Sequence, residues 1–373
     1  MSIPFKLIAS GLVMTSALAV AAAAQQPRIE NGAVTAQAAG SPFVQSFRSL
    51  VSSQPDVAWI GYSVPVTEGD RVMCCFDSGN TFVNGMASSS SGCCGACHLE
   101  NSSGTSMSSR TESTTAAGVV KLEGADRMVV LYRIADRKID RVRVFSEDCR
   151  LDAGGRPVRW LENVRPADSI ALLESLTTVE GDLKGRIADG AITAIALHGD
   201  PAADASLERL VAPGQPETVR KKVTFWLGNS RGRRGFDTLR RVMRDDPSIE
   251  VRKGAIFGLS QSRVPETLDT LISIARSDNE PRLRSEALFW LAQKAGQKVS
   301  TMIAERIDQD PDTEVKKKAV FALSQLPKDE GVPLLIKVAR TNTNLEVRKQ
   351  AMFWLGQSKD PRAVDFFADV LGK

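Results

Sequence analysis

The chain has 373 residues, of which 42% are hydrophobic, 25% are charged and 6% are aromatic, and its formal net charge is +4. This composition is that of a globular protein, which excludes a chain dominated by low-complexity sequence. The length is sufficient for two or three domains.

The first 24 residues have the pattern of a secretory signal peptide. Lys6 precedes an apolar run from Leu7 to Val20, and four alanines complete the segment at Ala24. A basic start, an apolar stretch and a small-residue cleavage site are typical of such peptides. A membrane anchor is disfavoured because the run is rich in small residues and no second apolar segment follows. We therefore expect residues 1–24 to be removed and the mature protein to be exported, periplasmic or secreted, with no membrane span.

A β-rich domain is predicted over residues 42–166, after a flexible leader over residues 25–41. Pro42 to Val51 has the apolar spacing of a helix. Later runs alternate and are rich in β-branched residues, which is typical of a small antiparallel sheet. The predicted strands are Val57–Val64, Arg71–Phe76, Gly118–Leu122, Met128–Ile134 and Lys138–Phe145, with two further short strands between Cys149 and Leu161. Ser169–Leu176 is predicted to be the helix that joins this domain to the rest of the chain.

All six cysteines of the chain fall inside this β-rich domain. They are Cys74, Cys75, Cys93, Cys94, Cys97 and Cys149. Export would place them in an oxidising compartment, where thiols pair. Six cysteines allow fifteen pairings, among which the sequence does not choose. We expect Cys74 and Cys75 to clamp a Ser-rich loop, residues 84–117, through one of the three cysteines inside it, and Cys149 to tie in the last hairpin.

Cys94, Cys97 and His98 also spell C-x-x-C-H, the motif of covalent c-type haem, in which His98 would be the proximal iron ligand. The flanking sequence is hydrophilic and no helix is predicted after it, whereas a haem needs apolar walls. A thioredoxin-like site would need a helix after the motif. A zinc site using Cys74 or Cys75 with Cys94 and Cys97 would need free thiolates. We expect disulfides, no metal and no cofactor, and we keep a periplasmic redox or haem protein as the alternative function.

The second half of the sequence repeats at a constant interval of about 32 residues, a length typical of helical repeats. Segments that begin at Val219, Val251, Leu283, Val315 and Val347 read VRKKVTFWLGNS, VRKGAIFGLSQS, LRSEALFWLAQK, VKKKAVFALSQL and VRKQAMFWLGQS. A segment beginning at Ile187 keeps the apolar positions and loses the basic and aromatic ones, so it is predicted to be a degenerate first member. A second apolar set at the same interval marks another helix in each unit: Leu207, Leu239, Leu271, Ile303, Leu335 and Phe367. Such helix-turn-helix units bury a continuous core only when stacked.

This repeat resembles the HEAT family. The resemblance is carried by the V-R-x-x-A-x-x-x-L helix and by an aspartate six residues before its basic residue, as in Asp246 and Arg252, Asp278 and Arg284, or Asp310 and Lys316. It implies a mainly α fold over residues 167–373, a HEAT-like solenoid of about six helical hairpins preceded by the small Cys-containing β-rich domain. It also implies that the aspartates and basic residues form a structural ladder along the solenoid.

No catalytic constellation is found in the sequence. It contains no P-loop, no G-x-S-x-G and no H-E-x-x-H motif. Neither His98 nor His198 precedes a glutamate, which excludes the iron hydroxylases among proteins with HEAT-like repeats, because these use paired His-Glu motifs. Beyond the fold, nothing resembles the pigment-binding bilin lyases of the same type. The protein is therefore predicted not to be an enzyme.

In each V-R helix a phenylalanine lies on the side opposite the predicted core. On a helical projection the Val, Ala and Leu positions fall within an arc of about 140°, whereas the phenylalanine falls at about 240° from the valine. A lysine precedes it by one turn and a glutamine follows it by one turn. This face is the predicted partner surface: Phe225, Phe257, Phe289, Phe321 and Phe353, with Lys221, Lys253, Lys317 and Lys349, and with Gln261, Gln293, Gln325 and Gln357. Two interpretations stay open, a groove floor and a row packed between helices as core.

The two halves of the chain differ in charge. From Gln215 to Lys373 there are 29 Lys and Arg against 21 Asp and Glu, a net charge of +8, whereas residues 25–214 have 18 against 23, a net charge of −5. A basic solenoid could bind nucleic acid, but export makes a protein or peptide of the cell envelope a better partner. We predict an exported binding or scaffold protein whose solenoid holds such a partner on its concave face.

Overall fold

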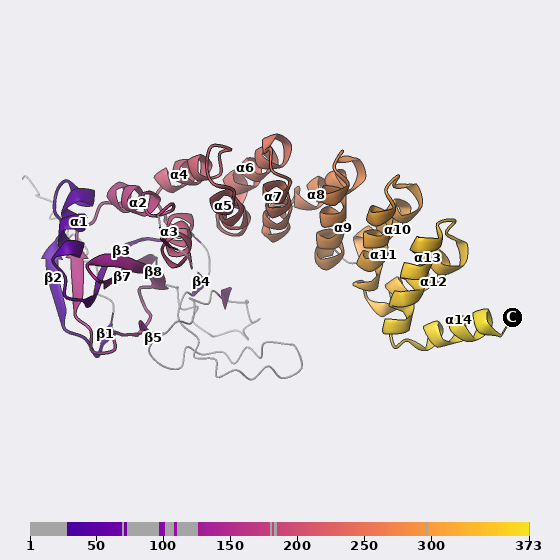
Figure 1. Cartoon of the computed structure of the whole chain (residues 1–373), viewed down its shortest axis with the longest axis horizontal. Helices are drawn as coiled ribbons and strands as arrows, with labels where there is room; N and C mark the ends of the chain where they lie inside the picture. Colours follow the sequence, from indigo (N-terminus) through magenta and orange to yellow (C-terminus); the bar gives the residue numbers. More distant parts are fainter. Residues whose placement is uncertain are drawn as a thin grey trace, which may run out of the picture.

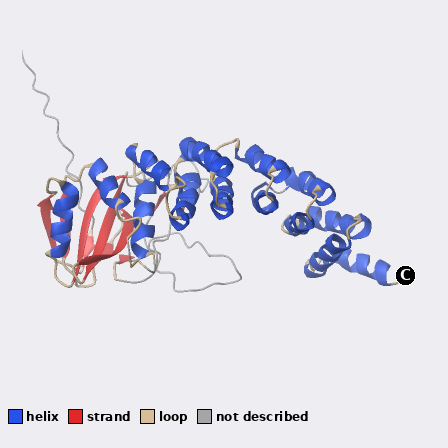
Figure 2. Ribbon diagram, turned by 45° about the horizontal axis from the view of Figure 1, so that its top comes forward, coloured by secondary structure: helices blue, strands red, loops and turns tan. Residues whose placement is uncertain are grey.

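A computed structural model of the chain describes residues 28–68, 71–72, 97–100, 108–109, 126–179, 181–182, 185–295 and 297–372. The predicted signal peptide, the predicted strand Gly118–Leu122, most of the Ser-rich loop and four of the cysteines (Cys74, Cys75, Cys93 and Cys94) lie outside these residues. A β-sheet region lies at the N-terminal end of the described chain, and a curved row of helices extends from it to the C-terminus (Figure 1; Figure 2).

A five-stranded mixed sheet forms the centre of the N-terminal region, in the order β2-β10-β3-β7-β8. Its strands are β2 (Val34–Ala38), β3 (Val57–Pro65), β7 (Arg127–Ala135), β8 (Lys138–Ser146) and β10 (Val158–Glu162). Strands β3, β7 and β8 are antiparallel, as predicted, but β2, β10 and β3 are parallel. The prediction of a purely antiparallel sheet was therefore wrong for this half. The helix α1 (Phe43–Ser52) carries the chain back between β2 and β3, so that both strands run in the same direction and β10 fits between them.

The leader predicted over residues 25–41 is also wrong for its described part. β1 (Ile29–Glu30) pairs with β9 (Leu151–Asp152), and β2 pairs along its whole length with β10. All five residues of β2 are exposed. Its sequence, VTAQA, alternates apolar and polar residues, but neither set is buried, so β2 is held in the sheet by its pairing with a distant segment.

Both faces of the sheet are covered, which gives the region three layers. Alternate residues such as Ile60 and Tyr132 pack against α1, α2 (Pro166–Glu174) and α3 (Arg186–Leu197). The intervening residues, such as Trp59 and Leu131, pack on the other side against a small parallel sheet of order β1-β9-β5. Here β5 is Cys97–His98, and a separate antiparallel pair joins β4 (Arg71–Val72) to β6 (Ser108–Ser109). Successive side chains along these strands point to opposite faces of the sheet, and both faces are buried.

From α3 onward the helices alternate between two rows. The inner row contains α3, α5 (Glu217–Ser230), α7 (Ile249–Gln261), α9 (Pro281–Ala295), α11 (Thr313–Ser324) and α13 (Leu345–Gln357). The outer row contains α4 (Ala202–Leu210), α6 (Gly232–Asp245), α8 (Thr267–Ser277), α10 (Gln297–Gln309), α12 (Lys328–Thr341) and α14 (Pro361–Leu371). In Figure 1, α5, α7 and α9 lie on the underside of the arch and α4, α6 and α8 on its upper side.

The predicted core positions of the repeat are confirmed. In α7 the side chains of Val251, Ala255 and Leu259 have no exposed surface, and the equivalent residues of α9, α11 and α13 are buried in the same way. One apolar cluster runs from Phe43 of α1 to Phe366 of α14. The solenoid and the helix-covered face of the sheet therefore share a continuous core. No helix in the described parts of the chain is long and apolar enough to cross a membrane.

The first repeat differs from the others because α3 packs against the edge strand β8. A Cβ atom added to Gly190 would lie 2.2 Å from the carbonyl oxygen of Val142. Ile187, Ala191 and Ile195 are buried, as predicted. On its N-terminal side α3 packs against a sheet, whereas each later inner helix packs against another inner helix. This difference explains why the sequence of α3 lacks the repeated aromatic and basic residues.

Buried and partly buried ion pairs connect successive repeats. Arg220 pairs with Asp246, Arg252 with Asp278 at 2.8 Å and Arg284 with Asp310 at 2.8 Å. Each arginine of an inner helix thus binds the aspartate that follows the next outer helix. These contacts confirm the ladder that the resemblance implies, and they show that the aspartate in question belongs to the following repeat. In the repeat formed by α11 and α12, Lys316 donates to the carbonyl oxygen of Asp308, and Asn342 takes the place of the aspartate.

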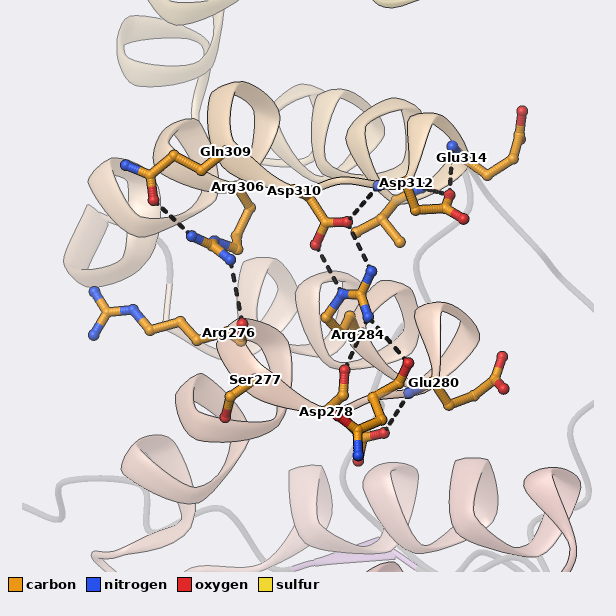
Figure 3. A network of polar contacts seen from close by, with 12 residues as sticks. Arg276, Ser277, Asp278, Glu280, Arg284, Arg306, Gln309, Asp310, Asp312 and Glu314 are labelled. Carbon is orange, nitrogen blue, oxygen red and sulfur yellow. Dashed lines mark hydrogen bonds and ion pairs between the residues drawn. The ribbon is translucent and has the colours of Figure 1, made fainter.

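Each rung of this ladder joins two turns of the solenoid. The guanidinium of Arg284 donates two hydrogen bonds to Asp310 and a third to the carbonyl oxygen of Asp278 in the preceding turn (Figure 3). Asp310 in turn accepts a hydrogen bond from the backbone N–H of Asp312, at the turn into α11. The side chain of Arg284 is 8% exposed and that of Asp310 is fully buried. The basic residue that opens this helix therefore has a structural role.

Replacing Arg284 by Leu should reduce the free energy of unfolding by about 3–5 kcal/mol, because it leaves the buried carboxylate of Asp310 without a cation. The measurement is urea unfolding followed by circular dichroism. Arg276→Leu is the matched control, since its pair with Glu305 is about half exposed and such a pair contributes only about 0–1 kcal/mol. Equal losses in the two variants would contradict the structural role assigned to the ladder.

The same rung predicts an acid sensitivity. Burial acts to raise the pKa of Asp310, but hydrogen bonds from Arg284 and from the N–H of Asp312 outweigh it, and the pKa lies below its ordinary value. A carboxyl with a lowered pKa stabilises the fold above its unfolded pKa of about 3.9, and this contribution is lost as the pH falls through the lower folded value. In Arg284→Leu the pKa of Asp310 should rise. The difference in unfolding free energy between the variant and the unaltered protein should therefore be smaller at pH 3 than at pH 7; a constant difference would contradict this.

Gly190→Ala should loosen the contact between α3 and the sheet. The added methyl group would collide with the backbone of Val142, and an overpacked contact of this kind costs about 1–3 kcal/mol. Gly214→Ala is the control, because no atom lies within 4 Å of its Cβ position. Thermal melts of both variants test the expectation, which fails if Gly190→Ala melts at the temperature of the control.

Candidate functional site

Eight aromatic rings form a continuous series across five helices of the inner row, which we name the aromatic ladder. It consists of Phe225 and Trp226 of α5, Phe257 of α7, Phe289 and Trp290 of α9, Phe321 of α11, and Phe353 and Trp354 of α13. Consecutive ring centroids are 4.7–6.0 Å apart. These separations are within the range of favourable aromatic contacts.

The contacts of the aromatic ladder alternate between two kinds. Phe225 stacks on Phe257 with an interplanar angle of 21°, and Phe289 stacks on Phe321 with an angle of 4°. Between these pairs, a tryptophan of the next helix takes the place of the phenylalanine as the ring partner. The contact pattern therefore repeats every second unit of the solenoid.

The alternation has its cause in the residue that follows each ladder phenylalanine. The position after each ladder phenylalanine is occupied in turn by Trp226, Gly258, Trp290, Ala322 and Trp354. A Cβ atom on Gly258 would lie 2.3 Å from the carbonyl oxygen of Thr224, so α5 and α7 are in backbone contact there. The small residue allows this close approach, and in the next interval the tryptophan of α9 supplies the ring contact. The regular exchange of large and small residues was the available signal.

The exposure of the phenylalanines is intermediate between that expected for a groove floor and that expected for a buried core. Phe225, Phe257, Phe289 and Phe321 are half-buried, and Phe353 at the C-terminal end is 55% exposed. The apolar core positions of the same helices are buried. The ladder is therefore a layer of rings outside the core, in which each ring shields part of its neighbour.

The predicted lysines lie on the same helices but are paired. Lys253 is 3.5 Å from Glu250, Lys317 is 2.9 Å from Glu314 and Lys349 is 3.0 Å from Glu346, each three residues earlier on its own helix. Lys221 of α5 is exposed. Pairs of this kind contribute about 0–1 kcal/mol. A charged partner could therefore replace the glutamates at little cost.

The predicted glutamines follow the ladder phenylalanines by one helical turn. Gln261 is half-buried, and Gln293, Gln325 and Gln357 are exposed. The amide nitrogens of Gln261 and Gln325 donate to the hydroxyls of Ser260 and Ser324 at 3.0 and 3.1 Å. Residues four apart lie on one face of a helix. The structure thus places lysine, phenylalanine and glutamine in adjacent rows along α7, α11 and α13.

Cys97 and His98, the described residues of the C-x-x-C-H motif, form β5, in a different part of the molecule. Cys97 is 1% exposed and Cys149 is 2% exposed, and both belong to the apolar cluster on the far side of the sheet from the helices. A thioether from Cys97 to a porphyrin would require this sulfur to leave the cluster. The disulfides expected among the six cysteines remain a prediction.

His98, beside Cys97, contacts a carboxylate. Its Nδ1 lies 3.0 Å from Asp152 Oδ2. The pKa of Asp152 is lowered by hydrogen bonds from the backbone N–H of Gly154 and from Asn31, which together outweigh its partial burial. Among the described residues, no group of three or more His, Cys, Asp or Glu side chains is arranged to hold a metal ion.

His198, the other histidine, is fully buried between α3 and α4. Its Nδ1 accepts a hydrogen bond from the backbone N–H of Asp200 at 3.2 Å. Burial lowers its pKa to about 4, so the imidazole is neutral at physiological pH. Neither histidine is part of the aromatic ladder.

Comparison with known proteins agrees with this architecture. Residues 213–292 and 301–373 match the sequence model of HEAT repeats. No curated protein sequence matches the chain significantly. Among solved structures, similarity is found to human deoxyhypusine hydroxylase (17% identity, 56% of this chain and 80% of that chain, TM-score 0.30). It is also found to the CpcE–CpcF complex of phycocyanin lyase from Nostoc (22%, 42% and 99%, TM-score 0.33) and to a karyopherin bound to a SUMO protease (14%, 55% and 27%, TM-score 0.35).

At these identities and TM-scores the likeness to the solved structures does not extend beyond the kind of repeat. The chain spans about a quarter of the karyopherin's length. The family assignment rests on the sequence match, on the paired rows of helices and on the buried arginine–aspartate rungs between them. The C-terminal part of the chain, residues 213–373, is a solenoid of HEAT repeats.

Proposed function

We propose that this protein is an exported, non-catalytic scaffold whose solenoid binds a protein or peptide partner along the aromatic ladder. The observation that carries the proposal is the continuity of eight partly exposed rings over five repeats. A scaffold alone does not need them, since the Val, Ala and Leu positions already fill the core. Aromatic side chains that are partly exposed in a contiguous row are typical of interaction surfaces.

The surroundings of the aromatic ladder also support an interface. Lysine–glutamate pairs lie on one side of the rings and glutamine amides on the other. An apolar strip with a polar rim is the usual arrangement of a protein-binding surface. The net charge of +8 from Gln215 to Lys373 favours a partner with acidic groups, which could compete with the glutamates for the lysines.

The proposal of export rests on the signal-like sequence of residues 1–24. It places the partner in the cell envelope and disfavours nucleic acid as a ligand of the basic solenoid. The C-x-x-C-H loop keeps a redox or haem function as the alternative. The burial of Cys97 supports the scaffold over this alternative, because a haem-linked sulfur must be accessible to the porphyrin.

The exposure of each phenylalanine predicts how much its replacement destabilises the fold. Phe236 of α6 is completely buried, so Phe236→Ala should cost about 3–5 kcal/mol. Phe353→Ser should cost about 1 kcal/mol, because the ring is half exposed and mainly loses one ring contact. Phe289→Ser and Phe321→Ser should fall between these values. If both melt as Phe236→Ala does, the row is core and the binding surface lies elsewhere.

Binding is tested with the double variant Phe289→Ser/Phe321→Ser in the mature chain. Proteins cross-linked to the unaltered chain in envelope extracts are identified by mass spectrometry, and the affinity of the main one is then measured with purified components. Loss of two aromatic anchors should weaken binding by at least about thirtyfold, which corresponds to about 2 kcal/mol. Phe367→Ser, a half-buried phenylalanine on the outer helix α14, is the matched control and should bind normally. Unchanged affinity of the folded double variant would refute the proposal.

A further inference from the structure

A cavity of about 770 Å³ opens at the edge of the sheet region, where three elements meet. These elements are the C-terminal half of α1, the turn between β7 and β8, and the segment that leads into α3. The cavity takes no part in the aromatic ladder, which lies on α5 to α13.

Four cationic side chains line this cavity: Arg48, Arg137, Lys138 and Arg186. Within the described chain, none of these four side chains makes an ion pair or hydrogen bond. Arg137 is held at the tip of the β7–β8 hairpin, where Asp136 and Arg137 have φ values of 50° and 58°. Two consecutive left-handed residues are typical of a tight hairpin turn. The backbone conformation of this turn therefore fixes the position of Arg137 at the cavity.

The two carboxylates that line the cavity are already engaged. Asp140 accepts a hydrogen bond from Arg133 at 3.1 Å. Asp182 accepts hydrogen bonds from the backbone N–H groups of Ile187 and Ala188, both at 2.9 Å, at the start of α3. Neither acid makes an ion pair with one of the four cations, so the described lining has four positive and two negative side chains.

A fifth cation, Arg141, lies close to Arg186, one of these four. Arg141 of β8 is half-buried, and its pKa is lowered by burial and by the nearby charges of Arg186 and Arg143. The effect of these neighbouring cations on the pKa of Arg141 indicates a region of positive potential, and an anion would relieve the repulsion.

The rest of the cavity wall is largely apolar. Val51 of α1, Leu176 and the α3 residue Ile187 are buried, Ile139 of β8 is half-buried, and all four line the cavity. A small-molecule site typically combines such apolar walls with a few polar groups that orient the ligand. A simple inorganic anion would leave these walls uncovered.

We propose that this cavity binds an anionic amphiphile, with a carboxylate or phosphate group at Arg48, Arg137, Lys138 and Arg186 and an apolar body over Val51, Ile139 and Leu176. Arginine is suited to either head group because its planar guanidinium can donate two parallel hydrogen bonds. The volume accommodates a ligand of the size of a medium-chain acyl group. The site gives the sheet region a ligand-binding role separate from the partner surface of the solenoid.

Isothermal titration calorimetry on the mature chain tests the proposal with four probes. Dodecyl phosphate and dodecanoate, both kept below their micelle-forming concentrations, should bind with one site per chain. Inorganic phosphate carries the head group alone, and dodecyl maltoside carries the apolar chain with an uncharged head. Each of these two should bind at least about tenfold more weakly than dodecyl phosphate, a difference of about 1.4 kcal/mol. Equal binding of either one would overturn the proposal.

The variant Arg137→Gln/Lys138→Gln removes two exposed cations at the hairpin tip and should weaken binding of dodecyl phosphate at least about tenfold. Arg263→Gln/Lys318→Gln removes the same charge from exposed positions on the solenoid and should bind as the unaltered chain does. If the two double variants behave alike, the effect is one of net charge and the assigned site is wrong. Binding to vesicles of anionic lipid without binding of the monomeric amphiphiles would show a membrane surface contact, and this too would overturn the proposal.

Discussion

The buried pair between an inner-helix arginine and the aspartate of the following turn is the contact on which the solenoid depends. Arg284 of α9 donates to the carbonyl oxygen of Asp278, in the turn before α9, and to the carboxylate of Asp310, in the turn before α11. One side chain therefore sets the distance between two turns that are one full repeat apart. Because the pair is buried, a change of spacing would leave a charge without a partner, which costs several kcal/mol. A repeat length without insertions over five units is consistent with this constraint.

The fixed spacing of the inner helices is what allows the aromatic ladder to be continuous. Ring contacts continue from each of these inner helices to the next, with centroids 4.7–6.0 Å apart, because the helices recur at a regular interval. Within that frame, Gly258 and Ala322 permit close approach, and the tryptophans occupy the alternate intervals. A rigid series of rings loses little conformational entropy when a partner covers it. The arginine–aspartate ladder and the proposed binding surface therefore both follow from the regular spacing of the repeats.

The sheet region gives the solenoid its N-terminal end. Repeat proteins need an end unit that covers the last apolar face, and here β8 covers α3, with Gly190 at the closest point. The same junction leaves a cavity where α1, the β7–β8 turn and the start of α3 meet. The cations around it come from three segments of the chain that are adjacent only because the sheet and the first repeat are docked together.

The sequence alone determined the features that depend on local periodicity. The constant repeat interval, the core positions such as Val251 and Leu259, the two helices of each unit and the β7–β8 hairpin all follow from the spacing of apolar residues, since neighbouring repeats present the same pattern to one another. The phenylalanine row could be located for the same reason. Its partial burial could not, because exposure depends on which ring the adjacent helix supplies.

Only the tertiary structure decided the features that join distant segments. β2 pairs with β10, far later in the chain, and all five of its residues are exposed, so burial of one face does not explain this strand. Arg252 could have paired with Asp246 or with Asp278, and the packing of one repeat on the next selects Asp278. The cavity cations Arg48, Arg137 and Arg186 share no motif. Their proximity arises from the docking of three elements, and no local pattern in a sequence records such a contact.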